Sequence, residues 1–182
     1  VTIVDRSIPR LRQLDEMFNG RVRTRYSTLE TIEHEVSIAD AVIGAVLIPG
    51  ASAPRLVTRK MLKHMKPGSV LVDVAIDQGG CFETSRPTTH ADPTYVVDGI
   101  IHYCVANMPG AVPQTSAAAL NNATLPYGLA LANKGVAALE SITETGRGLL
   151  AGLNVHEGKV TSQAVAESLN LEFVAPATAL AA

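Results

Sequence analysis

The chain has 182 residues, of which 47% are hydrophobic and 18% charged, and its formal net charge is −2. This length and apolar content suit one folded domain with an appended element and argue against intrinsic disorder. No basic stripe favours a nucleic acid or an anionic membrane as partner, and no apolar run approaches the roughly 20 residues that span a bilayer.

The first half of the chain alternates predicted strands and helices. We expect strands at 1–5, 21–26, 40–47 and 70–74. We expect helices from Ser7, as N-cap, to Gly20; over 29–38, with Ser27 as a possible cap; and over 58–65. Strand–helix alternation with short connections is typical of a parallel sheet built from βαβ units, so the fold class is α/β.

The pattern changes after residue 80. Residues 81–93 are polar and rich in turn formers, and two short strands are expected at 95–97 and 100–105. A long helical stretch follows over about 115–144, and Pro126 should break or kink it. A hairpin is expected at 155–161 and a short helix from Ser162 to Leu169.

The stretch VLVDVAIDQGG, residues 70–80, indicates where a ligand would bind. Its apolar start is typical of a buried parallel strand, and it ends in Asp77 and two glycines. Open α/β sheets bind ligands beyond the carboxyl ends of their strands, and glycines let backbone approach closely. Asp77 is therefore a candidate site residue, although it could simply cap a turn. Asn107, which precedes Met108, is likewise either a site residue or simply part of a turn.

Asp5 has the place of another site residue. In dinucleotide folds an acidic residue at the tip of the second strand binds the adenosine ribose, about 20 residues after a glycine-rich turn. Only four residues precede Asp5, so we expect the sequence to start at the second strand of such a fold, with the first strand missing. A carboxylate at this position favours NAD over NADP, although Arg6 could accept a phosphate. The simpler alternative is that Asp5 only terminates a strand.

Residues 73–90, DVAIDQGGCFETSRPTTH, and 102–127, HYCVANMPGAVPQTSAAALNNATLPY, closely resemble the alanine dehydrogenases. They look more distantly like the NAD-binding part of proton-translocating transhydrogenases, for which we expect a glutamate-alanine pair before the two glycines. The resemblance continues from VTIVDRSIPRLRQLD to GLNVHEGKVT. It implies a Rossmann-type doubly wound parallel sheet that lacks its first strand. Residues 1–110 would form the NAD-binding domain, and 111–182 a C-terminal helical segment that packs on an N-terminal domain absent from this chain.

The resemblance also implies an activity, the NAD-dependent, reversible oxidative deamination of L-alanine to pyruvate and ammonium. The catalytic lysine and histidine of the family would come from the N-terminal domain. The alternatives are the NAD-binding domain of a transhydrogenase, or an inactive truncated fragment that binds NADH weakly because it lacks the pyrophosphate-binding turn. The expected partners are a small-molecule substrate and further copies of the chain, six by resemblance, in the cytoplasm, with no nucleic acid and no membrane.

Residue roles follow from the same resemblance. Asp77 matches the aspartate beside the nicotinamide, and Asn107 lies in the matching loop above the ring, so both are implied in catalysis. The implied cofactor-binding residues are Asp5, Arg10, Ser27, Val46, Leu47, Val74, Ala75, Ile76, Asp77, Val105, Ala106, Asn107 and Met108. No spacing of histidines or cysteines predicts a metal site. We expect His102 to be a satisfied core or interface residue and Cys81 to be an inert thiol.

Overall fold

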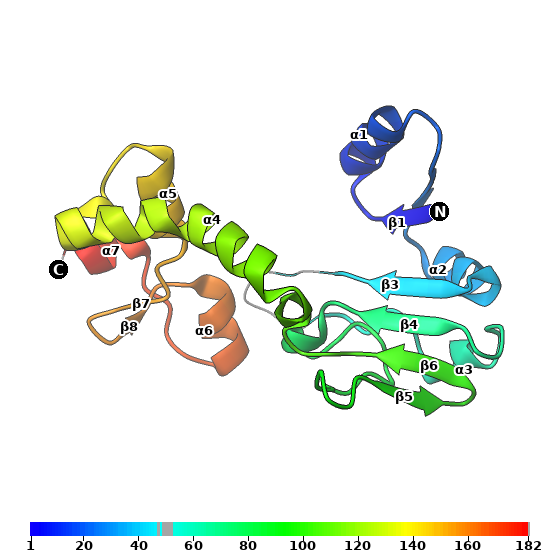
Figure 1. Ribbon diagram of the computed structural model, residues 1–182. Coiled ribbons are helices and arrows are strands. Elements are labelled where there is room, and N and C mark those ends of the chain that lie inside the picture. The colour runs from blue at the N-terminus through cyan, green and yellow to red at the C-terminus, as the bar shows by residue number, and fades with distance from the viewer. Residues whose placement is uncertain (47, 49–52, 182) are drawn as a thin grey trace. The chain divides into compact units, whose positions relative to one another are not determined.

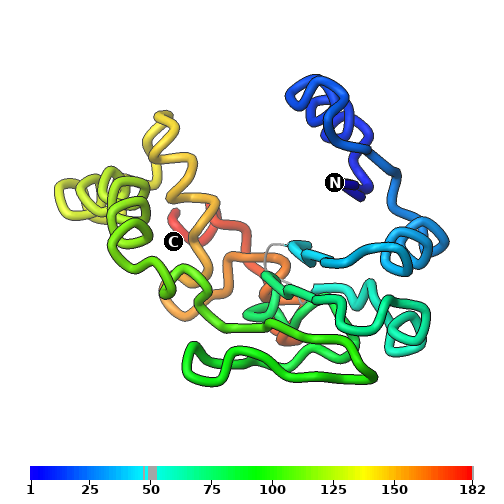
Figure 2. The backbone as a smooth tube through the Cα atoms, turned by 45° about the vertical axis from the view of Figure 1, so that its right-hand side comes forward, coloured from blue at the N-terminus to red at the C-terminus, as the bar shows by residue number. Residues whose placement is uncertain are grey.

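The computed structural model describes residues 1–46, 48 and 53–181, and the chain divides into two compact units. Figures 1 and 2 follow the backbone from the blue N-terminus to the red C-terminus. The first unit runs to Met108 and contains most of the strands, and the second contains the residues from Pro109 onward. All of the predicted site residues that the structure describes belong to the first unit.

A small parallel sheet opens the first unit. Strand β1 (Thr2–Asp5) pairs in parallel with β2 (Arg23–Tyr26), and α1 (Ile8–Phe18) connects them. The helix begins as predicted, because the Ser7 hydroxyl accepts a hydrogen bond from the Arg10 N–H. It ends where Asn19 and Gly20 adopt positive φ angles of 49° and 70°.

The larger sheet of the first unit has the order β3-β4-β6-β5. Its elements are α2 (Leu29–Ile38), β3 (Ala41–Gly44), α3 (Arg59–Leu62), β4 (Val70–Asp73), β5 (Thr94–Val97) and β6 (Ile100–Tyr103). Strands β3, β4 and β6 are parallel, whereas β5 pairs antiparallel with β6 in a hairpin, as the arrowheads in Figure 1 show. Thr28 rather than Ser27 caps α2, because its hydroxyl accepts from the Thr31 N–H at 3.0 Å.

The core of the first unit lies around this larger sheet. Leu71 of β4 and Ile100 of β6 are at most 1% exposed, and Leu62 of α3 and Val36 of α2 pack in the same apolar cluster. The strands are therefore short, yet their central side chains are removed from water, which is what stabilises a parallel sheet.

The α/β class with a parallel sheet is confirmed. Within the first unit, the described strands form two separate parallel sheets, and β5 adds an antiparallel edge to the larger one. Strand β4 also ends at Asp73, one residue earlier than predicted, so a carboxylate forms the last position of the strand itself.

The second unit is largely helical. Its elements are η2 (Met108–Ala111), α4 (Pro113–Lys134), η3 (Gly135–Ala138), α5 (Glu144–Ala151), β7 (Val155–His156), β8 (Lys159–Val160), α6 (Gln163–Leu169) and α7 (Pro176–Leu180). The hairpin of β7 and β8 turns at Glu157 and Gly158, within the predicted range 155–161. None of the helices that the structure describes is both long and apolar enough to cross a membrane.

Pro126 was predicted to break or kink the helix, and the break does not occur. Helix α4 continues through this proline and ends instead at Lys134, where Gly135 adopts a φ of 57°. A proline removes the hydrogen bond to the carbonyl four residues earlier, here that of Asn122. Both residues are exposed, so water can bind the freed carbonyl and the helix continues.

Candidate functional site

Three parallel strands end at the same edge of the larger sheet, and predicted site residues follow each of them. Val46 comes after β3, Val74–Asp77 after β4 and Val105–Met108 after β6. The register aligns Gly44 with Asp73 and Val72 with Tyr103, so these segments leave the sheet side by side. These predicted site residues therefore lie together at the carboxyl edge of the larger sheet. Leu47 lies outside the described residues.

Asp77 stands on the 3-10 turn η1 (Ile76–Gln78), directly beyond β4. The turn closes when the N–H groups of Gly79 and Gly80, at φ angles of 91° and 78°, donate to the carbonyls of Ile76 and Ala75 at 3.0 Å each. Ile76 is 4% exposed and anchors the turn, while Asp77 is exposed. Among the described residues its carboxylate accepts no hydrogen bond and forms no ion pair, so it is available to a cationic group. 

Asn107 occupies the corresponding place beyond β6. Its φ angle of 59° lies in the left-handed region, which asparagine tolerates well. The Asn107 carbonyl is 3.0 Å from His90 Nε2, and the segment before it is held because the Thr88 N–H donates to Cys104 at 2.9 Å. The backbone of this loop is thus fixed, and the Asn107 side chain is exposed to a ligand.

Three of the predicted cofactor-binding residues have buried side chains. Ala75 is 8% exposed, Ile76 4% and Val105 0%. These residues can offer only backbone atoms and shape to a ligand. Val74 differs from them, because 49% of its surface is exposed beside the Asp77 turn.

A second group of predicted residues belongs to the smaller sheet. Asp5 ends β1, and Ser27 follows β2, with its N–H donating to the Asp5 carbonyl at 2.9 Å. One Asp5 carboxylate oxygen, Oδ1, accepts from the Ser7 N–H at 2.7 Å, as in a strand-terminating turn. Arg10 lies on α1, where its guanidinium donates to Gln13. The predicted site therefore comprises two groups, each at the carboxyl ends of parallel strands but in separate sheets.

The structure also reveals a buried carboxylate that the sequence analysis missed. Asp73 is 0% exposed and accepts hydrogen bonds from the backbone N–H groups of Ala75 (3.1 Å), Cys81 (2.9 Å) and Phe82 (3.4 Å), and from the Ser85 hydroxyl. The signal was present in the sequence, because an aspartate inside an apolar strand must find partners when it is buried.

Cys81 packs against this carboxylate. Its side chain is 0% exposed, and its thiol donates to Asp73 Oδ1 at 3.4 Å. Burial, and next the negative charge of Asp73, raise the pKa of the Cys81 thiol to about 12. The reactive thiolate is therefore scarce near neutral pH, which supports the expectation of an inert cysteine.

A neighbouring buried cluster contains His102, which is 0% exposed. Its Nδ1 lies 3.0 Å from the Ile100 carbonyl and must donate to it, so in the neutral ring Nε2 accepts from the Thr84 hydroxyl at 2.7 Å. The ring stacks on Tyr95 with centroids 4.9 Å apart. Burial lowers the pKa of His102. The prediction of a satisfied core histidine is confirmed.

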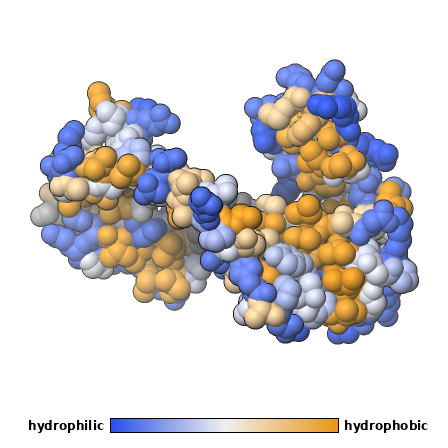
Figure 3. Space-filling view, in the orientation of Figure 1, coloured by the Kyte–Doolittle hydropathy of each residue, from blue (hydrophilic) through white to orange (hydrophobic). Residues whose placement is uncertain are grey.

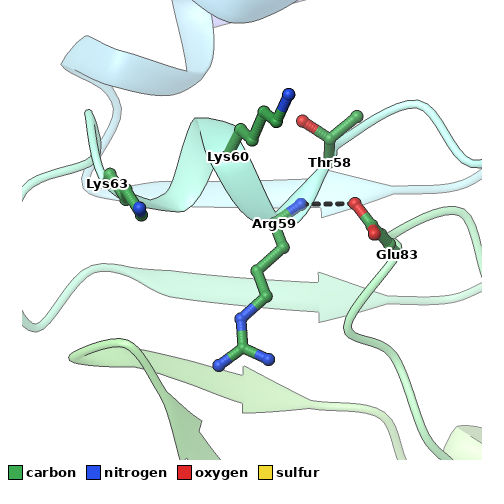
Figure 4. A pocket seen from close by; sticks show the side chains of 5 residues that line it. All are labelled: Thr58, Arg59, Lys60, Lys63 and Glu83. Atoms are coloured by element: carbon green, nitrogen blue, oxygen red, sulfur yellow. Dashed lines mark hydrogen bonds between the residues drawn. The ribbon is translucent and has the colours of Figure 1, made fainter.

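A cavity of about 460 Å³ lies elsewhere in the first unit, lined by Thr58, Arg59, Lys60, Lys63 and Glu83. Glu83 accepts from the Arg59 N–H at 2.7 Å, and in Figure 4 the side chains of Lys60 and Lys63 point apart. The Arg59 guanidinium pairs at 2.9 Å with Asp98, in the turn before β6 and thus near the amino end of that strand. Glu83 and Arg59 of this cavity already have partners within the protein, and the two lysines point in different directions. The cavity is therefore not the candidate site. 

The parallel sheet with its connecting helices, and the site residues at the carboxyl edge of that sheet, define a class of protein. This class is the Rossmann-type α/β domains, which bind a ligand beyond the carboxyl ends of parallel strands. The chain belongs to a particular family of that class: the family described as "Alanine dehydrogenase/PNT, C-terminal domain" matches residues 1–163. Among the part of the chain that is described, no group of three or more His, Cys, Asp or Glu residues is placed to hold a metal ion.

Individual relatives agree with this assignment. The chain is 61% identical over 178 residues to an alanine dehydrogenase of Halomonas elongata, covering 98% of this chain and 47% of that protein. It is 55% identical over 181 residues to an alanine dehydrogenase of Mycolicibacterium smegmatis, covering 100% and 48%. The chain thus spans about half the length of the curated relatives that it matches.

Two solved structures are also similar. An L-alanine dehydrogenase aligns with a TM-score of 0.78 and 49% identity, over 93% of this chain and 46% of that one. A transhydrogenase from Sinorhizobium meliloti aligns with a TM-score of 0.54 and 30% identity, over 64% and 32%. The likeness to the dehydrogenase is the stronger by every one of these measures.

Proposed function

We propose that this chain is the NAD-binding part of an NAD-dependent alanine dehydrogenase, which converts L-alanine to pyruvate and ammonium. One observation carries the proposal. The exposed carboxylate of Asp77 lies directly beyond β4, at the same edge as Asn107, in a chain 61% identical to an alanine dehydrogenase. The transhydrogenase alternative has weaker support, since that structure matches less of the chain at lower identity.

The residues at this edge fit a nicotinamide. Asp77 offers a carboxylate to positive charge, and the exposed Val74 offers apolar surface to a flat ring. The amide of Asn107 can both donate to and accept from a carboxamide. Asp5 keeps a second carboxylate oxygen for a ribose hydroxyl, since only Oδ1 is used by Ser7. The remaining predicted positions, Arg10, Ser27, Val46, Ala75, Ile76, Val105, Ala106 and Met108, would supply backbone and shape around these groups.

The role of this chain in the reaction is to bind, orient and stabilise charge. Bound NAD would supply a ring that accepts hydride. Asp77 would stabilise the positive charge that develops on the substrate nitrogen as the Cα–H bond breaks. Asn107 would hold the carboxamide, and the fixed backbone from Val105 to Asn107 would keep that amide in place. 

We also propose that the enzyme acts on a small-molecule substrate in the cytoplasm as a homo-oligomer, a hexamer by resemblance. The long helix α4, which has no buried residue in the isolated chain, supports an interface in this segment. Size-exclusion chromatography with light scattering tests the oligomer, and a strictly monomeric active enzyme would contradict it.

The experiment uses a chimeric enzyme, in which this chain replaces the matching half of the Halomonas elongata alanine dehydrogenase. Alanine-dependent NADH formation should be restored. Asp77→Asn should lower kcat on the order of 100- to 1,000-fold while NADH still binds, because one charge-stabilising group is lost. Asp98→Asn removes the same charge from a remote turn and is the control.

Two results would contradict the proposal. Full turnover by Asp77→Asn would remove its assigned role. Hydride exchange between NADH and NADP, with no turnover of alanine, would instead favour the transhydrogenase class.

A further inference from the structure

We propose that Asp73 is a positioning residue, whose buried carboxylate fixes the loop 74–82 and thereby sets the place of Asp77 at the carboxyl edge. The inference rests on the proposed function only for the role of Asp77. The anchoring of the loop is a separate claim that can be measured without any activity.

The first support is how the Asp73 charge is compensated. The side chain is 0% exposed, and within the described residues no lysine, arginine or histidine forms an ion pair with it. Its hydrogen bonds come from the N–H groups of Ala75, Cys81 and Phe82 and from the side chains of Cys81 and Ser85. A buried carboxylate that loses its partners is strongly unfavourable. The loop that supplies these donors is therefore held in one conformation.

The second support is where the donors lie relative to Asp77. Ala75 precedes it by two residues, and Cys81 follows it by four. Both ends of the turn are thus fastened to one carboxylate at the end of β4. Asp77 cannot move away from the strand without breaking at least one hydrogen bond to a buried charge. 

The third support concerns Gly80, whose φ angle is 78°. A Cβ at this position would lie 2.7 Å from Asp73 Oδ2 and 2.9 Å from Ser85 Cβ, whereas a Cβ at Gly79 would meet nothing within 4 Å. From the sequence alone, both glycines suggest close approach of the backbone to a ligand. For Gly80 the structure shows a different cause, because the loop closes tightly around the Asp73 carboxylate.

The decisive variant is Asp73→Asn, which keeps the shape but replaces one accepting oxygen with a donating NH₂ group. In the 182-residue chain, amide hydrogen exchange at residues 78–82 should become about tenfold faster, the loss expected for a hydrogen bond to a charged acceptor. Exchange at the amides of β6 should change much less. Asp98→Asn is the matched control, because it removes the same charge at a position whose φ of 51° suits asparagine.

In the chimeric enzyme, Asp73→Asn should lower kcat about 100-fold, as a misplaced charged group does, while the KM for alanine and the Kd for NADH stay near those of the parent. A purely structural aspartate would instead lower the amount of folded enzyme and leave its kcat unchanged. If Asp73→Asn does not fold by circular dichroism, Ser85→Ala decides, since it removes one donor and keeps the three backbone N–H groups. It should lower kcat about tenfold.

The outcomes separate the two claims. A folded Asp73→Asn with unchanged kcat overturns the positioning role, as does an unchanged kcat in Ser85→Ala where that variant decides. If the parent chimera itself turns over no alanine, the proposed function fails. Hydrogen exchange then still tests the anchor, and unchanged exchange at residues 78–82 overturns it.

Discussion

Strand β4 and helix α4 are both rich in apolar residues, yet they are buried to opposite degrees. Leu71 of β4 is 0% exposed, whereas none of the 22 residues of α4 is buried, and Leu120 and Leu129 are 66% and 53% exposed. Apolar surface is visible over both units in Figure 3. In β4 the apolar side chains meet a covering layer within the same unit, while in α4 they are spread around the helix axis without one preferred face.

The difference shows that apolar content does not determine burial in an isolated chain. A helix that is apolar all round is normally enclosed by other elements. This agrees with the expectation that residues 111–182 pack against another domain, which stays a prediction. The substitutions below test whether the contrast in burial is also a contrast in stability.

The largest effect is expected for Leu71→Ala. This substitution truncates a fully buried side chain in the apolar core around β4, so it should lower the free energy of unfolding by about 3–4 kcal/mol. Urea denaturation followed by circular dichroism measures the change. A loss below about 1 kcal/mol would mean that the interior around β4 is far less well packed than the structure indicates.

Local sequence signals account for most of the fold that could be predicted. The helix that starts at Ser7 and the hairpin at Glu157 depend on capping and turn residues within a few positions, and both were placed correctly. Ser27 is the predicted cap of α2, but its neighbour Thr28 also carries a hydroxyl and forms the cap in the structure. The order of β3, β4 and β6 depends on pairing between distant segments, which no local pattern specifies. The antiparallel pairing of β5 with β6 is different, because the two-residue turn at Asp98 and Gly99 is a local hairpin signal.

The candidate site also has residues that local sequence signals predict and one that they do not. Asp77 and Asn107 could be placed beyond strands because strand ends are visible in the sequence. Asp73 was missed because its role depends on donors up to twelve residues away, such as the Ser85 hydroxyl, which come together only when the loop folds. A charged residue within an apolar strand was the available clue.

A smaller effect, which depends on pH, is expected from His102 in the β4–β6 region. Burial lowers its pKa from the ordinary value of 6.5, so below that pH the unfolded chain binds a proton that the folded chain does not. The contribution of His102 to the free energy of unfolding should therefore be fully present above pH 6.5. It should fall on acidification toward the lowered pKa, by at most about 1.4 kcal/mol per pH unit.

Urea unfolding at about pH 7.5 and about pH 5 measures this dependence. His102→Gln should reduce it. An identical pH dependence in His102→Gln and the parent would show that this buried ring does not contribute.

The smallest effect is expected for Leu129→Ala on α4. The chemical change equals that of Leu71→Ala, but this side chain is 53% exposed, so the free energy of unfolding should change by less than about 0.5 kcal/mol. A loss above about 1 kcal/mol in the same urea experiment would show that α4 is covered within the 182-residue chain.

The chimeric enzyme adds the protein half on which this segment is predicted to pack. If Leu129→Ala destabilises the chimera more than the isolated chain, the exposed apolar surface of α4 is an interface; if both respond equally little, α4 remains exposed in the complete enzyme and the predicted packing is wrong.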